Sequence, residues 1–333
     1  MDFTRVIENK KINKLWCDKY APNSLEKIYG NHDILQPFYN SIKKSKDGIS
    51  SLLINGPHGC GKSTIARLIA KELLGNQYSK NLMQIYSSIS RNKTYVNNKC
   101  VIDNKNINDF INRMNGDLKL KIIIVYDIDT TNYETQEIFC ELLRYNHVRI
   151  IFTCNNIDTL SNNILSSVMT ITMSLLSYNE IYSIITSIEK SNNMNIAEDL
   201  KNALCITCNG DIKTVFNIMQ LLSGIKEKEI TSEKFYKLVD IPSYDCVKCM
   251  IIFCCNKDVS AAYKKLKEIL SNGYDIRDIV NMIEKTLLYI DIVESNITEN
   301  QYVKMLEIVT YYLIFRPYTK IQIFNMISKM AAA

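Results

Sequence analysis

Short, continuously apolar runs mark the first half of the chain. Three of them, SLLIN (51–55), KIIIVYD (121–127) and RIIFTCN (149–155), have the length of a strand and are apolar almost throughout. Such runs are typical of parallel strands that helices cover on both faces. The segments 65–75 and 133–145 have helical spacing instead, and Gly75 is placed to end the first of them. The pattern therefore predicts an α/β domain with a mostly parallel sheet over about the first 170 residues.

Helical periodicity replaces the strand pattern after about Met173. Helices are expected over 177–193, 196–208 and 212–222, and four more between Cys246 and Met330. Pro242 interrupts the pattern, and Gly273 is placed to end a helix whose successor Asp275 or Asp278 caps. We expect four parts: a flexible N-terminus (1–14), an α/β domain (15–173), a small helical domain (174–240) and an all-helical C-terminal domain (241–333).

Composition narrows the class of protein. Hydrophobic residues make up 47% of the 333 residues and charged residues 23%, which excludes a disordered chain or a fibre. The net charge of +5 is too small to argue for nucleic-acid binding on its own. The chain has no run of about 18 apolar residues, so we expect no transmembrane helix. The N-terminus does not look like a secretory signal. Eleven cysteines in this setting indicate reduced thiols and an intracellular protein.

A phosphate-binding loop follows the first expected strand. The motif GxxxxGK[ST] is matched by Gly56, Pro57, His58, Gly59, Cys60, Gly61, Lys62 and Ser63, with Thr64 next in the helix. Glycines let backbone N–H groups turn toward phosphates, Lys62 reaches the outer phosphates, and the Ser63 hydroxyl can bind Mg²⁺. A strand before the loop and a helix after it are the context that the motif requires. The sequence therefore predicts ATP and Mg²⁺ as ligands.

Two polar residues at strand ends complete the candidate site. Asp127 ends the second apolar run and is placed to hold Mg²⁺, and Asn155 ends the third, where an amide can orient an attacking water. Many ATPases have a catalytic glutamate directly after this aspartate, but here the position is Ile128. Asp129 could substitute for it. Successive strand residues face opposite ways, however, so we first interpret Asp129 as a helix-cap or loop residue.

These motifs, in this order, resemble the small subunits of replication factor C, the sliding-clamp loader. WCDKYAPNSLEKIYGN (16–31) is similar to the family's N-terminal segment, CNGDIKTVFNIMQ (208–220) to its second sensor, and NGYDIRDIV (272–280) to part of its collar. The resemblance implies an AAA+ P-loop domain, a helical lid and a helical collar. It also implies that Tyr20, Pro22 and Ile28 line an adenine pocket and that Lys213 is the second-sensor cation.

The resemblance implies partners as well. They are the other subunits of a hetero-pentameric ring, a sliding clamp, and primer–template DNA held through its phosphate backbone, with no membrane. Weak candidates for the DNA contacts are Arg91, Lys93 and Arg113, and the family's DNA-contacting segment is reduced to Ser88–Asn92. The expected location is the nucleus in a cellular eukaryote, or a cytoplasmic replication site if the chain is viral.

Departures from the family pattern affect hydrolysis more than binding. Ile128 replaces the glutamate, Ser167 stands where the family has an arginine finger, and Lys213 replaces an arginine. Lysine keeps the charge but loses the fork that grips phosphate in two places. Because the binding groups remain, we expect a subunit that binds ATP and hydrolyses it slowly or not at all. The alternatives are a pseudo-ATPase that only scaffolds the complex, and a stand-alone P-loop enzyme such as a nucleotide kinase.

Two cysteine pairs invite a zinc interpretation. Cys205 and Cys208 form one CxxC pair, and Cys246 and Cys249 form the other. The separation between the pairs exceeds the usual spacing, and both pairs lie in expected helices. We therefore favour packing of these thiols in the core over a zinc site.

Overall fold

The structure is a computed structural model. It describes residues 15–44, 50–86, 104–112, 120–225, 231–290, 297–315 and 319–333, and the expected flexible N-terminus lies outside these ranges. The chain divides into two compact units. The first comprises Met1–Ile181 and Gly210–Gln220, and the second comprises Tyr182–Asn209 and Leu221–Ala333. The proposed boundaries at 173 and 240 stay a prediction.

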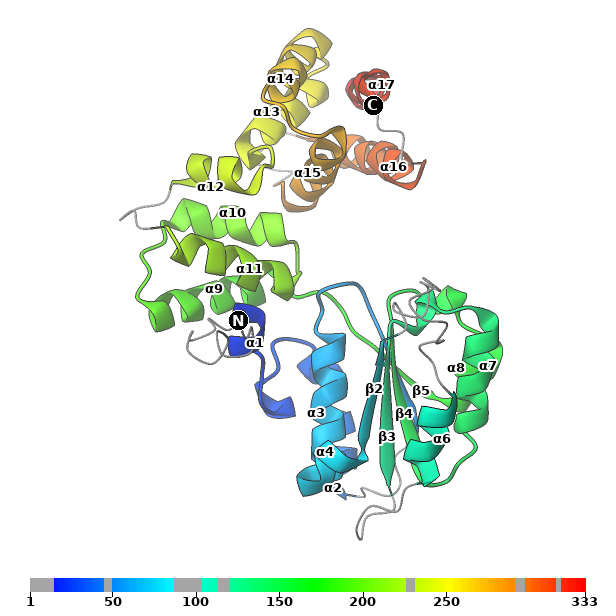
Figure 1. Ribbon diagram of the computed structural model, residues 1–333. Coiled ribbons are helices and arrows are strands. Elements are labelled where there is room, and N and C mark those ends of the chain that lie inside the picture. The colour runs from blue at the N-terminus through cyan, green and yellow to red at the C-terminus, as the bar shows by residue number, and fades with distance from the viewer. Residues whose placement is uncertain are drawn as a thin grey trace, which may run out of the picture. The chain divides into compact units, whose positions relative to one another are not determined.

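A five-stranded parallel sheet forms the centre of the first unit (Figure 1). The strand order is β2-β3-β4-β1-β5. The register pairs Leu52 with Ile151 and with Met169, and Ile124 with Ile151. The strands are β1 (Leu52–Asn55), β2 (Leu82–Tyr86), β3 (Lys121–Tyr126), β4 (Val148–Cys154) and β5 (Met169–Thr172). The α/β fold with a parallel sheet is therefore confirmed.

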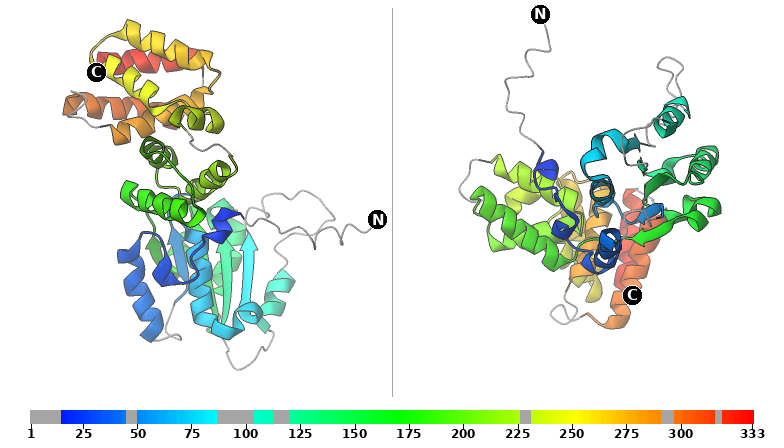
Figure 2. Two further views of the ribbon diagram at one scale, coloured as in Figure 1. Left: turned by 90° about the vertical axis from the view of Figure 1, so that its left-hand side faces the viewer. Right: turned by 90° about the horizontal axis from the view of Figure 1, so that it is seen from below.

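Helices cover both faces of this sheet, as Figures 1 and 2 show. On one face lie α2 (His32–Lys44), α3 (Lys62–Leu74) and α4 (Tyr78–Asn81). On the other lie α6 (Asn104–Asn112), α7 (Tyr133–Leu142) and α8 (Asn162–Ser167). Shorter elements of the unit are α1 (Trp16–Lys19), η2 (Leu25–Lys27), η3 (Gly75–Gln77), η4 (Ile128–Thr130) and η5 (Ile157–Thr159).

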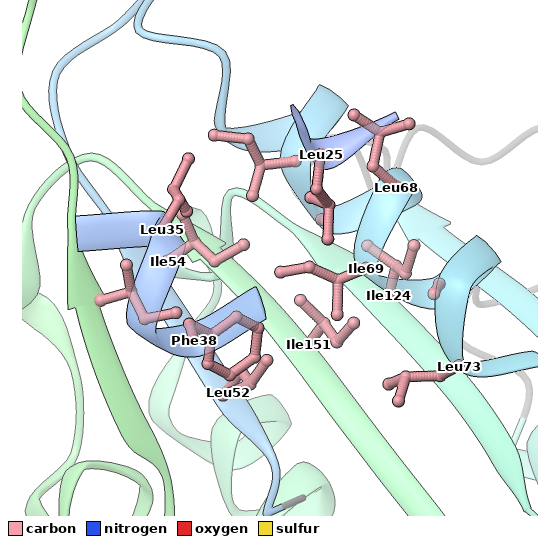
Figure 3. Close-up of a cluster of buried hydrophobic side chains, with 14 of the residues drawn as sticks. Leu25, Leu35, Phe38, Leu52, Ile54, Leu68, Ile69, Leu73, Ile124 and Ile151 are labelled. Carbon is pink, nitrogen blue, oxygen red and sulfur yellow. The ribbon is translucent and has the colours of Figure 1, made fainter. Parts of the chain in front are cut away.

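Alternate residues of the central strands enter two separate cores. Ile122 and Ile124 of β3 pack in the cluster under α3, whereas Ile123 and Val125 pack in the cluster under α7. All four side chains are fully buried. Figure 3 shows the first cluster, which includes Phe38, Leu52, Ile54, Leu68, Ile69, Leu73, Ile124 and Ile151. Burial of both faces explains why these strands are apolar at nearly every position.

The second unit is helical in the residues that the structure describes. Its helices are α9 (Tyr178–Asn192, after the first turn), α10 (Glu198–Cys208), α12 (Ser232–Val239), α13 (Tyr244–Cys255), α14 (Val259–Ser271), α15 (Ile276–Tyr289), α16 (Glu299–Phe315) and α17 (Lys320–Ala332). The remaining helix, α11 (Ile212–Ser223), belongs to the first unit as far as Gln220. Among the described helices, none is both long and apolar enough to cross a membrane.

Local signals in the sequence account for several helix ends in the second unit. Ser243 caps α13 and Asp258 caps α14 by accepting hydrogen bonds from backbone N–H groups. Gly273, with a φ of 90°, follows α14, as the sequence predicts. Asp275 is the N-cap residue of α15, although its side chain makes no capping hydrogen bond.

Candidate nucleotide-binding site

The phosphate loop connects β1 to α3. Its glycines Gly59 and Gly61 have φ values of 80° and 95°, in the left-handed region that favours glycine. A side chain at position 59 would also overlap the carboxylate of Asp211, whereas position 61 has open space. The chain therefore requires glycine at 59 for two reasons, conformation and close approach.

Lys62 begins α3 and lies over the loop. Its side chain is 6% exposed, and its ammonium group donates to the carbonyls of Gly56 (2.8 Å) and Pro57 (2.7 Å). Lysine has three N–H donors, so the third can reach a phosphate oxygen. The first turn of α3 also presents free backbone N–H groups and the positive end of the helix dipole. This end of the loop is consequently suited to an anion.

Asp127 and Asn155 lie at the carboxyl ends of β3 and β4. Asp127 has left-handed backbone angles (φ 53°, ψ 51°), and its N–H donates to the Thr153 hydroxyl at 3.0 Å. The amide nitrogen of Asn155 lies 3.5 Å from an Asp127 carboxylate oxygen and 3.4 Å from one of Asp129. Asp129 is part of the short turn η4, as expected of a loop residue, and its carboxylate lies next to the side-chain amide of Asn155.

Ile128 lies on the opposite side of this turn. Its side chain is fully buried in the cluster that contains Phe139 and Phe152. The position that carries a glutamate in many ATPases therefore holds a core residue here.

The start of α11 forms another wall. Asp211 accepts hydrogen bonds from the N–H groups of Lys213 (2.8 Å) and Thr214 (3.1 Å), and so caps the helix. The Asp211 carboxylate also lies 3.8 Å from the His58 ring of the phosphate loop. These contacts place Lys213 beside the loop.

The N-terminal segment fastens onto α11. The Trp16 N–H donates to the Gln220 side chain at 2.9 Å, and Tyr20 stacks on Phe216 with ring centroids 5.8 Å apart. The Cys17 thiol lies 3.1 Å from the Asn217 amide oxygen. These contacts hold α1 and the segment after it in place next to the loop.

The loop, the strand ends, α11 and the N-terminal segment enclose a cavity of about 410 Å³. All of its lining residues belong to the first unit. The sequence-predicted residues that line it are Pro22, Ile28, His58, Gly59, Cys60, Gly61, Lys62, Ser63, Thr64, Asp127, Asn155 and Lys213. Gly56, Pro57 and Tyr20 do not line it, although Tyr20 stacks on Phe216, which does.

Several lining residues escaped the sequence analysis. Tyr29 and Phe216 add two aromatic rings to the wall, and Arg67 adds a cation whose Nε donates to the Ser63 carbonyl at 3.2 Å. The signal for Phe216 was available. It follows Lys213 by three residues in a helix, and residues at that spacing share a face.

The chemistry of the lining fits an anion with an apolar end. Three cations from two helices line the cavity, Lys62 and Arg67 of α3 and Lys213 of α11, while Pro22, Ile28 and the aromatic rings supply an apolar surface. Burial raises the pKa of the Cys60 thiol, which therefore stays neutral beside the loop.

Mg²⁺ fits the same cavity. The Ser63 hydroxyl and the Asp127 carboxylate both line it, and Mg²⁺ prefers a few such oxygen ligands completed by phosphate and water. Within the described ranges, no group of three or more His, Cys, Asp or Glu side chains could hold a metal ion by itself.

The candidate zinc cysteines differ in burial. Cys205 and Cys208 are buried in the core, Cys246 is partly buried, and Cys249 is exposed. Burial raises the pKa of Cys205 to about 12, so this thiol is neutral. The burial of the first pair agrees with packing.

The candidate DNA-binding residues lie outside the part of the chain that the structure describes. They are Arg91, Lys93, Arg113 and the segment Ser88–Asn92.

Two family models match the chain in order. The ATPase family associated with various cellular activities (AAA) matches residues 52–175, and the replication factor C C-terminal domain matches residues 242–329. A replication factor C small subunit of Methanococcus maripaludis is 25% identical over 288 residues, which cover 85% of this chain and 88% of the relative. One of Methanocella arvoryzae is 26% identical over 287 residues, 85% of this chain and 86% of the relative.

Solved structures agree on the fold. The Holliday junction branch migration motor RuvB of Thermotoga maritima superposes with a TM-score of 0.53 at 14% identity, over 78% of this chain and 90% of that one. This likeness supports a P-loop domain with helical parts. The two ordered family matches and the curated relatives support a replication factor C small subunit.

Proposed function

We propose that this chain is an ATP-binding subunit of a replication factor C-like clamp loader, which places a sliding clamp on primer–template DNA, and that its own hydrolysis of ATP is weakened. The observation that carries the proposal is the cavity, where the phosphate loop, Asp127, Asn155 and Lys213 meet in one unit. The similarity to replication factor C small subunits suggests the process in which such a site acts.

Each wall of the cavity has a role in binding. Backbone N–H groups of the loop and the third N–H of Lys62 bind the phosphates, while Ser63 and Asp127 hold Mg²⁺, which neutralises phosphate charge. Pro22 and Ile28 supply apolar surface that would suit the base and ribose, and Tyr20 supports that wall through Phe216. Lys213 adds a single-point contact to the phosphates.

Weak hydrolysis follows from groups that the chain lacks. Ile128 is buried and cannot take a proton from water. Ser166 and Ser167 occupy the stretch where the family carries an arginine finger, and both hydroxyls donate to the Asn163 carbonyl within α8. A missing finger lowers phosphoryl-transfer rates by about 10³-fold or more, at the neighbouring site that the finger would serve.

Assembly into a hetero-pentameric ring is the expected context. The last two helices expose large apolar side chains, which lone soluble domains tend to avoid in clusters. Val303, Ile314, Phe315 and Ile321 are 62%, 73%, 65% and 81% exposed. These side chains support an interface with other subunits within the C-terminal part. We expect the assembly to act inside the cell, in a nucleus or at a viral replication site.

The test uses the full chain and the complex that co-purifies with it. Lys62→Ala should lower the affinity for ATP at least tenfold and reduce clamp loading, whereas the control Lys71→Ala, an exposed lysine of the same helix, should change neither. Normal loading by Lys62→Ala despite lost ATP binding would favour the pseudo-ATPase scaffold. Phosphoryl transfer to a nucleoside monophosphate would favour the kinase alternative.

A further inference from the structure

The turn after β3 does not continue the strand. The strand ends at Tyr126, Asp127 takes a left-handed conformation, and Ile128–Thr130 form the 3₁₀ helix η4. As a result, the alternation of strand side chains is broken after Asp127. Ile128 turns into the core, and Asp129 comes to the same amide group as Asp127.

One nitrogen of Asn155 therefore faces two carboxylates. The Asn155 Nδ2 lies 3.5 Å from Asp127 Oδ1 and 3.4 Å from Asp129 Oδ2. Both carboxylates are acceptors, so they select the NH₂ side of the amide. Because the oxygen and nitrogen of an amide point in different directions, the Asn155 carbonyl is turned away from the two aspartates. Asn155 itself lines the nucleotide cavity.

We propose that Asp129 is a positioning residue, which together with Asp127 fixes the Asn155 amide so that its carbonyl oxygen accepts a hydrogen bond from the water that attacks ATP. This inference rests on the proposed function. It assigns a role to a residue other than the one at the position of the family's catalytic glutamate, which Ile128 occupies.

The chemistry that Asn155 serves is the ordinary hydrolysis of a phosphoanhydride. The water oxygen forms a bond to the γ-phosphorus, and the bond from that phosphorus to the β–γ bridging oxygen breaks. The bridging oxygen keeps the electron pair and leaves as part of ADP. The water proton passes to a phosphate oxygen, because an amide carbonyl orients the water but does not become its base.

A further observation argues against a purely structural role for Asp129. Its other carboxylate oxygen, Oδ1, is buried and has no hydrogen-bond partner in the part of the chain that the structure describes, which is costly for a group that only closes a turn.

The test compares three variants of the full chain. Asp129→Ala removes the acceptor, Asp129→Asn keeps an oxygen that can accept the same hydrogen bond, and Asp158→Ala removes an exposed carboxylate from the adjacent turn η5 as a control. Two quantities are measured. One is the single-turnover rate of γ-³²P-ATP hydrolysis with chain in excess, and the other is the ratio of the dissociation constants of ADP and ATP from equilibrium titration.

The two quantities should move in opposite directions for Asp129→Ala. Hydrolysis should fall about tenfold, because the water loses its acceptor. The preference for ATP over ADP should rise about three- to tenfold, because the freed amide can donate its NH₂ to the γ-phosphate. Asp129→Asn should keep most of the rate, and Asp158→Ala should match the unaltered chain.

Three results would overturn the inference while leaving ATP binding intact. These are an unchanged rate in Asp129→Ala, a parallel loss of rate and ATP affinity, or an unaltered chain that binds ATP without any turnover. Absence of ATP binding by the unaltered chain is distinguishable, because it removes the proposed function and the inference together.

Discussion

Replacing Gly59 by alanine should separate the phosphate loop from the helix that carries Lys213. The added methyl group would overlap the Asp211 carboxylate. That carboxylate is not free to move, because it accepts hydrogen bonds from Lys213, Thr214 and the Thr214 hydroxyl. Alanine at position 59 must therefore displace the cap of α11 or distort the loop.

The magnitude follows from two contributions. Alanine at a left-handed φ costs about 1–2 kcal/mol, and Gly59 has a φ of 80°. Loss of the Asp211 cap adds about 1 kcal/mol. Gly61→Ala provides the matched control, since Gly61 lies in the same loop with a left-handed φ of 95° but has open space where a Cβ would be. The two variants should differ by the cap alone, about 1 kcal/mol in the free energy of unfolding.

The single tryptophan gives a local assay. Trp16 is 9% exposed, and its backbone N–H donates to the side-chain oxygen of Gln220, near the end of α11. Its fluorescence in a urea titration therefore follows the first unit. With a slope of about 2 kcal/mol per molar urea, the Gly59→Ala midpoint should lie about 0.5 M below that of Gly61→Ala.

Equal midpoints for the two variants would refute the reasoning. That result would mean that the carboxylate moves without loss of the cap, and that the contact between loop and helix carries no stability. A lower midpoint for Gly61→Ala would contradict it as well.

Three further substitutions test other parts of the structure. Lys213→Arg should raise ATP affinity about three- to tenfold, because the guanidinium binds phosphate at two points; calorimetry showing no gain would contradict this. Phe152→Ala should cost about 3–5 kcal/mol in a denaturant titration, since Phe152 is fully buried against Phe139, and a loss below about 1 kcal/mol would count against the packing. Desolvation, and then Asp275 and Asp240, raise the pKa of Asp278 above its usual value. A raised carboxyl pKa means that stability falls as the pH rises through the unfolded and then the folded pKa. Asp278→Asn should therefore raise the melting temperature at neutral pH and leave it unchanged in acid, and an equal gain at both would contradict the assignment.

Strand prediction from the sequence succeeded where burial was complete and failed at the edges of the sheet. The strands β1, β3 and β4 are continuous apolar runs because both of their faces are covered. The edge strands β2 and β5 were not predicted. In β5 only Ile171 is buried, and β2 contains Gln84 and the half-exposed Tyr86. Edge strands lack the burial that makes the pattern visible.

Some residues of the candidate site could be predicted from the sequence, and others could not. The phosphate loop and Asp127 could be found because their spacing along the chain is fixed by the chemistry of phosphate binding. Asp129 could not be placed, because the strand rule that argued against it ends at Tyr126, one residue before the left-handed Asp127. Tyr29 was missed because an aromatic residue in an irregular segment has no pattern that points to a pocket.

The burial of Ile128 has an evolutionary consequence. A lineage with this turn cannot regain a glutamate at position 128 by one substitution, because the new carboxylate would enter a core lined by Phe139 and Phe152. A buried charge without a partner costs several kcal/mol, a large share of the 5–15 kcal/mol that stabilises a typical domain. Reversal would require the turn to be rebuilt first. Loss of the glutamate at position 128 is therefore hard to reverse. Later selection on the catalytic rate can act only on residues that still face the nucleotide.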